Sequence, residues 1–160
     1  MASDNEVRKQ LVALLTVRQA HMLFEDAVAD FPVEHINTRP ANVEYTFWQL
    51  IEHLRLAQWD ILDYIQNPNY TAPEFPKGYW PTSGSTTDAE GWNQSIEQFR
   101  TDRQALVDIV NNPDTNLYAQ IPHGEPGHTI IREIEVIGAH NAYHIGELGI
   151  LRQIMNLWAN

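Results

Sequence analysis

The sequence contains no cysteine, which excludes disulfides, thiolate metal ligands and a cysteine nucleophile. Any metal ion held by side chains must therefore be bound through nitrogen or oxygen. The chain is also poor in cations, because 10 Lys and Arg stand against 21 Asp and Glu and give a formal charge of -11 at pH 7. Nucleic-acid phosphates and anionic membrane surfaces repel a chain of this charge. We therefore predict that neither nucleic acid nor a membrane is a partner.

A secretion signal and a membrane-spanning segment are missing as well. Residues 1–6 are polar and lack both a positively charged start and an apolar stretch, and no apolar run approaches the ~18 residues that cross a bilayer. We expect a soluble, cytoplasmic protein. With 160 residues, the chain is predicted to form a single domain, residues 1–160, that is long enough to bury most of its apolar surface.

Apolar residues at helical spacing predict four amphipathic helices, and no strand pattern competes with them. The expected segments are 3–31, capped by Ser3 with Glu6; 42–67, capped by Asn42; 87–112, capped by Thr87 with Glu90; and 129–155, capped by Thr129. Each segment has one apolar stripe that can turn inward. This pattern predicts an all-α fold, a four-helix bundle.

The connection at residues 67–86 holds four prolines and four aromatic residues, so it is neither a helix nor a featureless linker. When extended it could reach about 66 Å, whereas a helix of about 24 residues is only about 36 Å long. It could therefore cross the whole bundle and make the second and third helices parallel. The loop at 113–128 is also long, so loop length alone leaves the topology open.

Three histidines fall near the middle of two predicted helices. His140 and His144 are separated by one helical turn, which places their rings about 40° apart around the axis and about 6 Å apart along it, so that one cation can bridge them. A catalytic metal with an open position usually has three protein ligands, and His53 is the best third candidate. The apolar neighbours of these residues predict a partly buried, neutral imidazole, which is the form that binds metal.

The same residues have a plainer interpretation, as polar side chains that are hydrogen-bonded inside a bundle or solvated on its surface. Glu147, one turn beyond His144, is the candidate catalytic residue: it could act as a general base, a fourth ligand or a residue that orients His144, or it could be an exposed helix glutamate. The other histidines are not expected to bind the metal, namely His21 on the first helix and His35, His123 and His128 in loops.

Several pieces of sequence, taken in their order and spacing, resemble the DinB/YfiT-like superfamily of metal-dependent proteins. They are the segment Trp48-Gln-Leu-Ile-Glu-His53-Leu, the loop Gly78-Tyr-Trp-Pro81, Trp92 with Phe99-Arg-Thr-Asp-Arg103, and His140-Asn-Ala-Tyr-His144-Ile-Gly-Glu-Leu. The similarity spans residues 5–157. It implies a DinB-like bundle with up-down-down-up topology and a divalent metal held by three histidines, which map onto His53, His140 and His144.

A metal on three neutral imidazoles leaves two enzymatic interpretations open. One is hydrolysis, with Glu147 moving a proton. The other, implied by the resemblance, is transfer or isomerisation that uses a low-molecular-weight thiol, which must come as a cosubstrate because the chain has no cysteine. A third interpretation is a stress-response protein that binds a metal or small ligand without catalysis. Imidazole suits zinc, nickel and iron alike, so the ligands do not identify the metal.

The expected partner is a small-molecule substrate. A homodimer is also compatible with the sequence, because Leu157 and Trp158 near the C-terminus read as apolar residues that the bundle does not require.

Overall fold

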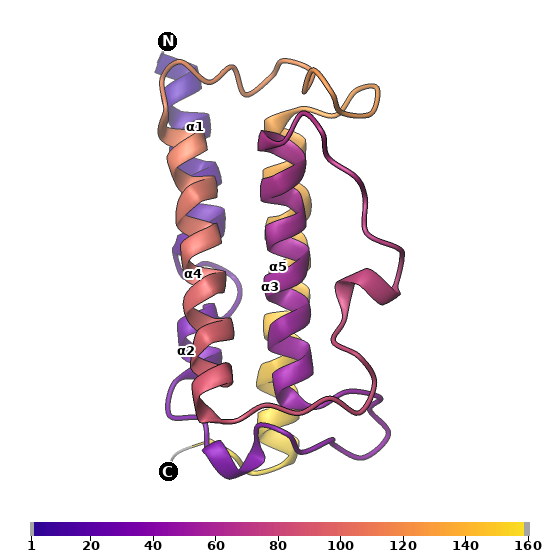
Figure 1. The fold of residues 1–160 in the computed structure, drawn as a ribbon. Helices are drawn as coiled ribbons and strands as arrows, with labels where there is room; N and C mark the ends of the chain where they lie inside the picture. The colour runs from indigo at the N-terminus through magenta and orange to yellow at the C-terminus, as the bar shows by residue number, and fades with distance from the viewer. Residues whose placement is uncertain (1, 159–160) are drawn as a thin grey trace.

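The computed structural model describes residues 2–158, and Figure 1 shows its long helices packed as a bundle. The elements are α1 (Ala2–Thr16), α2 (Phe24–Val28), the 3-10 turn η1 (Val33–His35), α3 (Phe47–Gln66), the 3-10 turn η2 (Lys77–Tyr79), α4 (Ala89–Asn111) and α5 (Ile130–Ile154). Residues 2–158 contain no strand, so the predicted all-α fold is confirmed. Across the same residues, no helix combines the length and the apolarity needed to cross a bilayer.

The long helices form a square in which α3 packs against α4 and α5, and α1 packs against the same two helices. Following the colours of Figure 1, α1 and α5 run in one direction while α3 and α4 run in the other. The connection between α3 and α4 passes along the full length of the bundle, beside the α3 and α5 pair. This long return brings the chain back to the end where α3 began and allows α4 to lie parallel to it.

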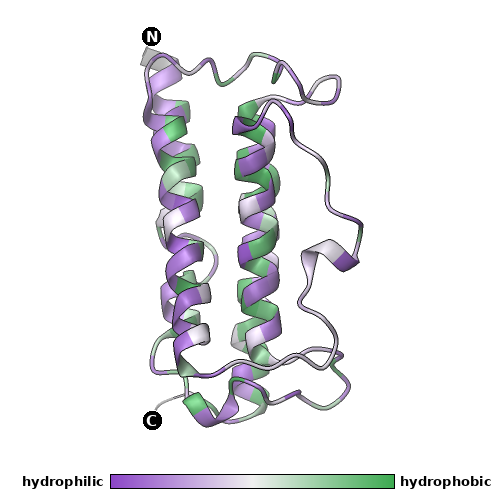
Figure 2. Cartoon of the chain, viewed as in Figure 1, coloured by the Kyte–Doolittle hydropathy of each residue, from purple (hydrophilic) through white to green (hydrophobic). Residues whose placement is uncertain are grey.

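The core consists of two clusters of buried apolar side chains, and Figure 2 shows that every long helix contributes hydrophobic residues. One cluster is built around Phe24, Phe47 and Phe99, and the other around Leu106 and Ile134. Between them lies a buried polar contact across three helices. The side chain of Gln58, which is 0% exposed, accepts a hydrogen bond from Asn141 at 3.0 Å and donates one to the carbonyl of Phe99 at 2.6 Å. Both the amide oxygen and the amide nitrogen of Gln58 are therefore hydrogen-bonded at mid-bundle.

The prediction of one continuous first helix over 3–31 is wrong. The structure divides this segment into α1 and α2, which are separated by the irregular residues 17–23. Phe24 follows Leu15 by nine positions, so a continuous helix would point the two side chains about 180° apart. Both are buried, with Leu15 7% and Phe24 1% exposed. The chain must leave the helix between them to bury both.

The predicted start of the second helix at Asn42 is also wrong. The N-cap of α3 is Thr46, whose hydroxyl accepts a hydrogen bond from the backbone N–H of Gln49 at 3.2 Å. The Gln49 side chain returns the contact to the backbone N–H of Thr46 at 2.9 Å. This reciprocal capping box satisfies two backbone donors, whereas Asn42 lies in a turn with a positive φ of 64°.

The other predicted caps have mixed outcomes. Thr129 is the N-cap of α5, as expected. The cap of α4 is Asp88 rather than Thr87, because the Asp88 carboxylate accepts a hydrogen bond from the backbone at Gly91. Ser3 lies inside α1, which already begins at residue 2, and its side chain lies outside the described part of the structure.

The apolar residues at the C-terminus pack within this chain. Leu157 is only 7% exposed, and its carbonyl accepts a hydrogen bond from Arg152 at 2.9 Å. The same guanidinium lies over the ring of Trp158 at 3.9 Å. Leu157 and Trp158 therefore make contacts within one chain. They do not support the homodimer, which stays a prediction.

We expect Phe24→Ala to lower the free energy of unfolding by about 3–5 kcal/mol, because it removes a large buried ring and leaves a cavity. Phe24 is 1% exposed and stacks on Phe99 at 4.0 Å. Denaturant unfolding measures the change. The control is Phe75→Ala, at a ring that is 84% exposed, which should stay within about 0.5 kcal/mol of the wild type. Equal effects of the two substitutions would show that α2 is not part of the core.

Candidate metal centre

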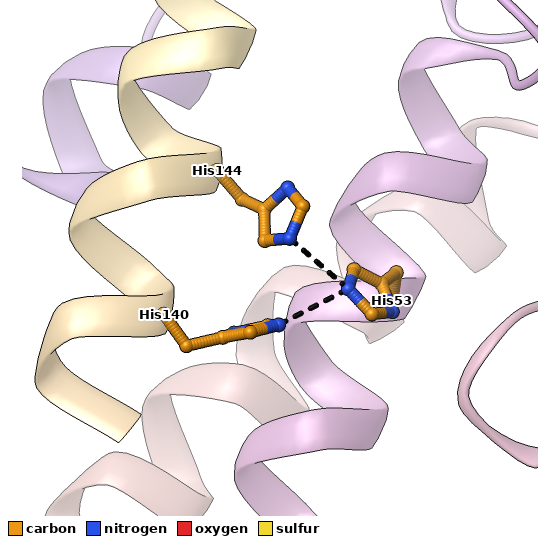
Figure 3. Close-up of side chains that lie close together, drawn as sticks. All are labelled: His53, His140 and His144. Atoms are coloured by element: carbon orange, nitrogen blue, oxygen red, sulfur yellow. Dashed lines mark hydrogen bonds between the residues drawn. The ribbon is translucent and has the colours of Figure 1, made fainter. Parts of the chain in front are cut away.

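Three imidazole rings converge at mid-bundle where α3 faces α5, as Figure 3 shows. The Nε2 atom of His53 lies 3.1 Å from Nε2 of His140 and 3.2 Å from Nε2 of His144. One nitrogen from each ring falls within 4.8 Å of the others. A tetrahedral ion with nitrogen ligands at about 2.0–2.1 Å separates those ligands by about 3.3 Å. The two short separations therefore fit a single shared ion, and the cluster could hold one.

Helical phase brings these rings together. His140 and His144 lie one turn apart on α5, and His53 occupies the facing side of α3. His53 is only 7% exposed, and its helix neighbours Leu50 and Leu54 are both 0% exposed. The three histidines that the sequence singled out thus meet at the edge of the apolar core.

Hydrogen bonds to the opposite ring nitrogens determine where the protons lie. Nδ1 of His53 donates to the carbonyl of Tyr79 at 2.7 Å, and Nδ1 of His144 donates to a carboxylate oxygen of Glu147 at 2.8 Å. In a neutral ring this leaves Nε2 with a lone pair and no hydrogen. Two such lone pairs face each other at 3.2 Å between His53 and His144. They repel unless a proton or a metal cation lies between them.

Burial favours the neutral form of two of the rings, His53 and His140. Burial lowers the pKa of His53 below its usual 6.5, although the bond to the Tyr79 carbonyl opposes this. Burial, with repulsion from His144 and His53, lowers the pKa of His140 to about 4. The Nδ1 atom of His140 is buried and has no hydrogen-bond partner within residues 2–158. Neutral imidazoles are the form that coordinates a metal, so the donor set suits a divalent ion.

Glu147 lies behind His144, on the Nδ1 side of the ring, and not beside the three Nε2 atoms. One of its carboxylate oxygens accepts the hydrogen of His144, and the other accepts the hydroxyl hydrogen of Tyr45. Burial, together with this bond, raises the pKa of the Tyr45 phenol. Of the roles predicted for Glu147, the geometry favours orientation of His144 over direct ligation. The part played by Tyr45 had no signal in the sequence.

The loop between α3 and α4 covers the outer side of the centre. The Trp80 ring stacks on His53, with ring centroids 3.9 Å apart and an interplanar angle of 3°. Tyr45 lies against the same Trp80 at 4.8 Å. Gly78 permits the tight loop, because a Cβ there would lie 2.6 Å from the Cβ of Pro73. The aromatic content of residues 67–86 signalled that the loop covers something, but did not specify His53.

A cavity of about 210 Å³ opens beside His53 and His140. Its walls are largely apolar, and neither Lys nor Arg is among the described residues that line it. Asp60 also lines it and is 7% exposed; its carboxylate accepts hydrogen bonds from the hydroxyls of Tyr70 at 2.8 Å and Tyr79 at 3.0 Å. Burial raises the pKa of Asp60. Asp60 was missed in the sequence, although seven residues of helix place it within about 20° of His53.

The remaining histidines lie away from the three rings, as the sequence predicted. His21 falls in the break between α1 and α2, and His35 belongs to η1. His123 and His128 lie in the loop before α5, where both contact Tyr64. A larger cavity of about 830 Å³ runs between α3 and α4, and none of the histidines is among the residues that line it.

The chain matches the family model of the DinB superfamily over residues 16–148. The chain belongs to the DinB superfamily. The match spans α3, α4 and most of α5, and so includes all three histidines of the cluster. No curated protein and no solved structure matches the chain. Membership of the DinB superfamily therefore agrees with the resemblance found in the sequence motifs, while the reaction must be argued from the site.

For protein freed of metal by chelation, we expect the free energy of unfolding to fall as the pH drops from 7 to about 4. Folded His140 takes up its proton only at about pH 4, whereas the ordinary value is 6.5. In this window the unfolded state binds a proton that the folded state does not, which lowers stability. His140→Gln should flatten this part of the curve, as measured by denaturant unfolding at each pH.

His35→Gln, which changes a histidine outside the cluster, provides the control and should keep the wild-type slope. A His140→Gln protein with that same slope between pH 7 and 4 would contradict a buried neutral ring at this position.

Proposed function

We propose that this DinB-superfamily protein is a metal-dependent enzyme in which His53, His140 and His144 hold one divalent ion. The strongest support is the pair of Nε2 atoms of His53 and His144, 3.2 Å apart, when each ring has its Nδ1 hydrogen committed to another acceptor. Lone pairs at this separation repel each other, and a divalent ion bound between the rings would remove that repulsion. When bound, a divalent ion supplies positive charge that stabilises a thiolate or hydroxide nucleophile at neutral pH.

The residues around the rings hold them in place. Glu147 fixes the tautomer and the rotation of His144, and Tyr45 holds the Glu147 carboxylate from its other oxygen. The carbonyl of Tyr79 and the stacked ring of Trp80 do the same for His53. Partners of this kind commonly change metal affinity by about 10–100-fold when they are removed. These contacts hold the Nε2 atoms of His53 and His144 toward each other.

We propose transfer or isomerisation with a low-molecular-weight thiol as the reaction, which is the type that the DinB resemblance implies. The thiol loses its proton and its sulfur forms a bond to an electrophilic carbon of the second substrate. At the same time the bond from that carbon to a leaving group breaks, or a π bond at that carbon opens, and the electron pair released takes up the proton. The cavity of about 210 Å³ beside His53 and His140 would receive that substrate. Its largely apolar walls suit the apolar part of a small molecule.

Hydrolysis is the second candidate, and the charge of the cavity favours it. No Lys or Arg lines this cavity in the described part of the chain, so an acidic thiol finds no positive partner there. A water molecule that acts as the nucleophile needs no positively charged partner. The third alternative is that the protein binds a metal or a small ligand without catalysis, and the tests below distinguish it from the two reactions.

Protein purified without a metal-affinity tag should contain one divalent ion per chain by elemental analysis. His144→Ala should lower the affinity for Zn²⁺ or Ni²⁺ at least about 100-fold, because it removes a ligand rather than a residue that orients one. Glu147→Gln should lower it about 10–100-fold while the ion is still bound. The matched control is His128→Ala, in the loop before α5. Retention of wild-type affinity in His144→Ala would exclude the proposed centre.

A panel of substrates separates the two reactions. Electrophiles offered with low-molecular-weight thiols should be converted only when the thiol is present, whereas esters and amides should react without it if the protein is a hydrolase. We expect activity on the first set, and its loss in His53→Ala. Turnover of neither set by metal-loaded protein would favour a binding role.

A further inference from the structure

The cavity beside the histidines adjoins a second one along the bundle. The second cavity, of about 410 Å³, lies toward the end of α3 and shares Asp60 and Ile61 with the first. Both cavities are lined by α3, by α5 and by the connection between α3 and α4, and the loop before α5 lines the second cavity as well. The α3 wall passes from Ala57 to Tyr64, the α5 wall passes from Ile137 to Glu133, and the connection between α3 and α4 covers each of them. We call the pair the α3–α5 cleft.

Asp60 stands at the boundary between the two parts of the cleft. It accepts one hydrogen bond from Tyr70, which lines the second cavity, and one from Tyr79, which lines the first. From His53 to Tyr64 the α3 wall rises by about 16 Å, at about 1.5 Å per residue. A ligand that follows this wall would place one end beside the histidines and the other beside Tyr64.

The far part of the cleft has the chemistry of a cation site. Its lining includes the carboxylates of Asp60, Glu125 and Glu133, and no Lys or Arg is among its described lining residues. Arg132 contacts Glu133 at 2.6 Å and balances that charge, but Asp60 is held only by uncharged hydroxyls.

Aromatic surface accompanies these carboxylates. Tyr64 and Tyr70 line the cavity and meet edge to face, with centroids 4.9 Å apart. The Tyr64 hydroxyl is fixed by contacts with His128 at 3.0 Å and with the backbone N–H of Glu125 at 2.7 Å. Aromatic faces beside carboxylates attract organic cations, and ammonium groups in particular.

We propose that the α3–α5 cleft binds an elongated substrate that carries a protonated amine at one end and an apolar segment at the other. The amine lies among Tyr64, Tyr70 and Glu125, and the apolar segment passes Ile61 toward His53. The assignment of the apolar end to the reacting end rests on the proposed function. The amine site itself does not depend on a bound metal.

The test is calorimetric titration of n-alkylamines of increasing length, set against n-alkanols and n-alkyl carboxylates of equal length. It is done first on protein freed of metal by chelation, so that the amine cannot bind the ion, and then on Zn²⁺-loaded protein. Amines should bind about tenfold more tightly than alkanols of the same length, and carboxylates should bind most weakly. Equal binding of amines and alkanols, or tighter binding of carboxylates, would overturn the cation assignment.

Two substitutions locate the ligand. Glu125→Gln, at an exposed position on the rim, should remove most of the preference for amines. Glu44→Gln, which removes one negative charge from a side chain that is 95% exposed, is the control and should leave the preference unchanged. An unchanged preference in Glu125→Gln, or an equal loss in both variants, would overturn the proposed site.

Chain length tests the continuity of the cleft. Val136 is 42% exposed and lines the cavity beside the histidines, so Val136→Trp fills that part with little disturbance of the core. It should abolish the gain in affinity that longer amines show while short amines bind as before. If longer amines still bind Val136→Trp more tightly than short ones, a single ligand does not occupy both cavities. Amine binding by a protein that fails the metal analysis would overturn the proposed function alone.

Discussion

Two of the three imidazole rings are oriented by hydrogen bonds from the nitrogen on the far side of each ring. His53 and His144 each donate from Nδ1 to a fixed acceptor, and this commits both Nε2 lone pairs to the same small space. An isolated pair of histidines would avoid this by rotating or by changing tautomer. Here the carbonyl of Tyr79 and the carboxylate of Glu147 hold each ring in one tautomer and orientation, so the two lone pairs face each other in a geometry that a cation between them would stabilise.

The bundle topology provides one of those acceptors. Tyr79 belongs to the connection between α3 and α4, which must run the length of the bundle because the two helices are parallel. A short hairpin between antiparallel helices would leave the outer face of His53 open to water. The long return instead places Trp80 on that face and encloses the cavity next to it. The connection that the parallel helices require is thus also the wall of the site.

Helical periodicity made the three histidines predictable. His140 and His144 are neighbours on any α-helix, and a mid-helix His53 was the natural third residue once two helices were expected to pack. Asp60 could have been found in the same way, since it shares the face of His53. Predictions failed where distant contacts decide the outcome. The break before Phe24 depends on which sides of α1 and α2 become buried.

The residues that orient the rings could not be predicted for the same reason. Tyr45 lies outside the helices, and its bond to Glu147 joins positions that are far apart in the sequence. Trp80 was visible only as one aromatic residue in a proline-rich loop. No local pattern encodes such contacts, because they depend on how the connection folds back over α3 and α5. Sequence periodicity therefore determines which histidines face the centre, and tertiary packing determines how their rings are held.

Charge affects the choice of substrate in two ways, through the net charge of the whole chain and through the residues that line the cleft. The formal charge of -11 raises the local concentration of cations around the whole molecule, but salt screens that effect beyond about 8 Å at physiological ionic strength. Within that distance the lining of the cleft decides, and it presents carboxylates and tyrosines without a lysine or arginine among its described lining residues. Both effects favour a divalent ion and a protonated amine over an acidic thiol. A thiol cosubstrate used at this centre should therefore be one of low negative charge.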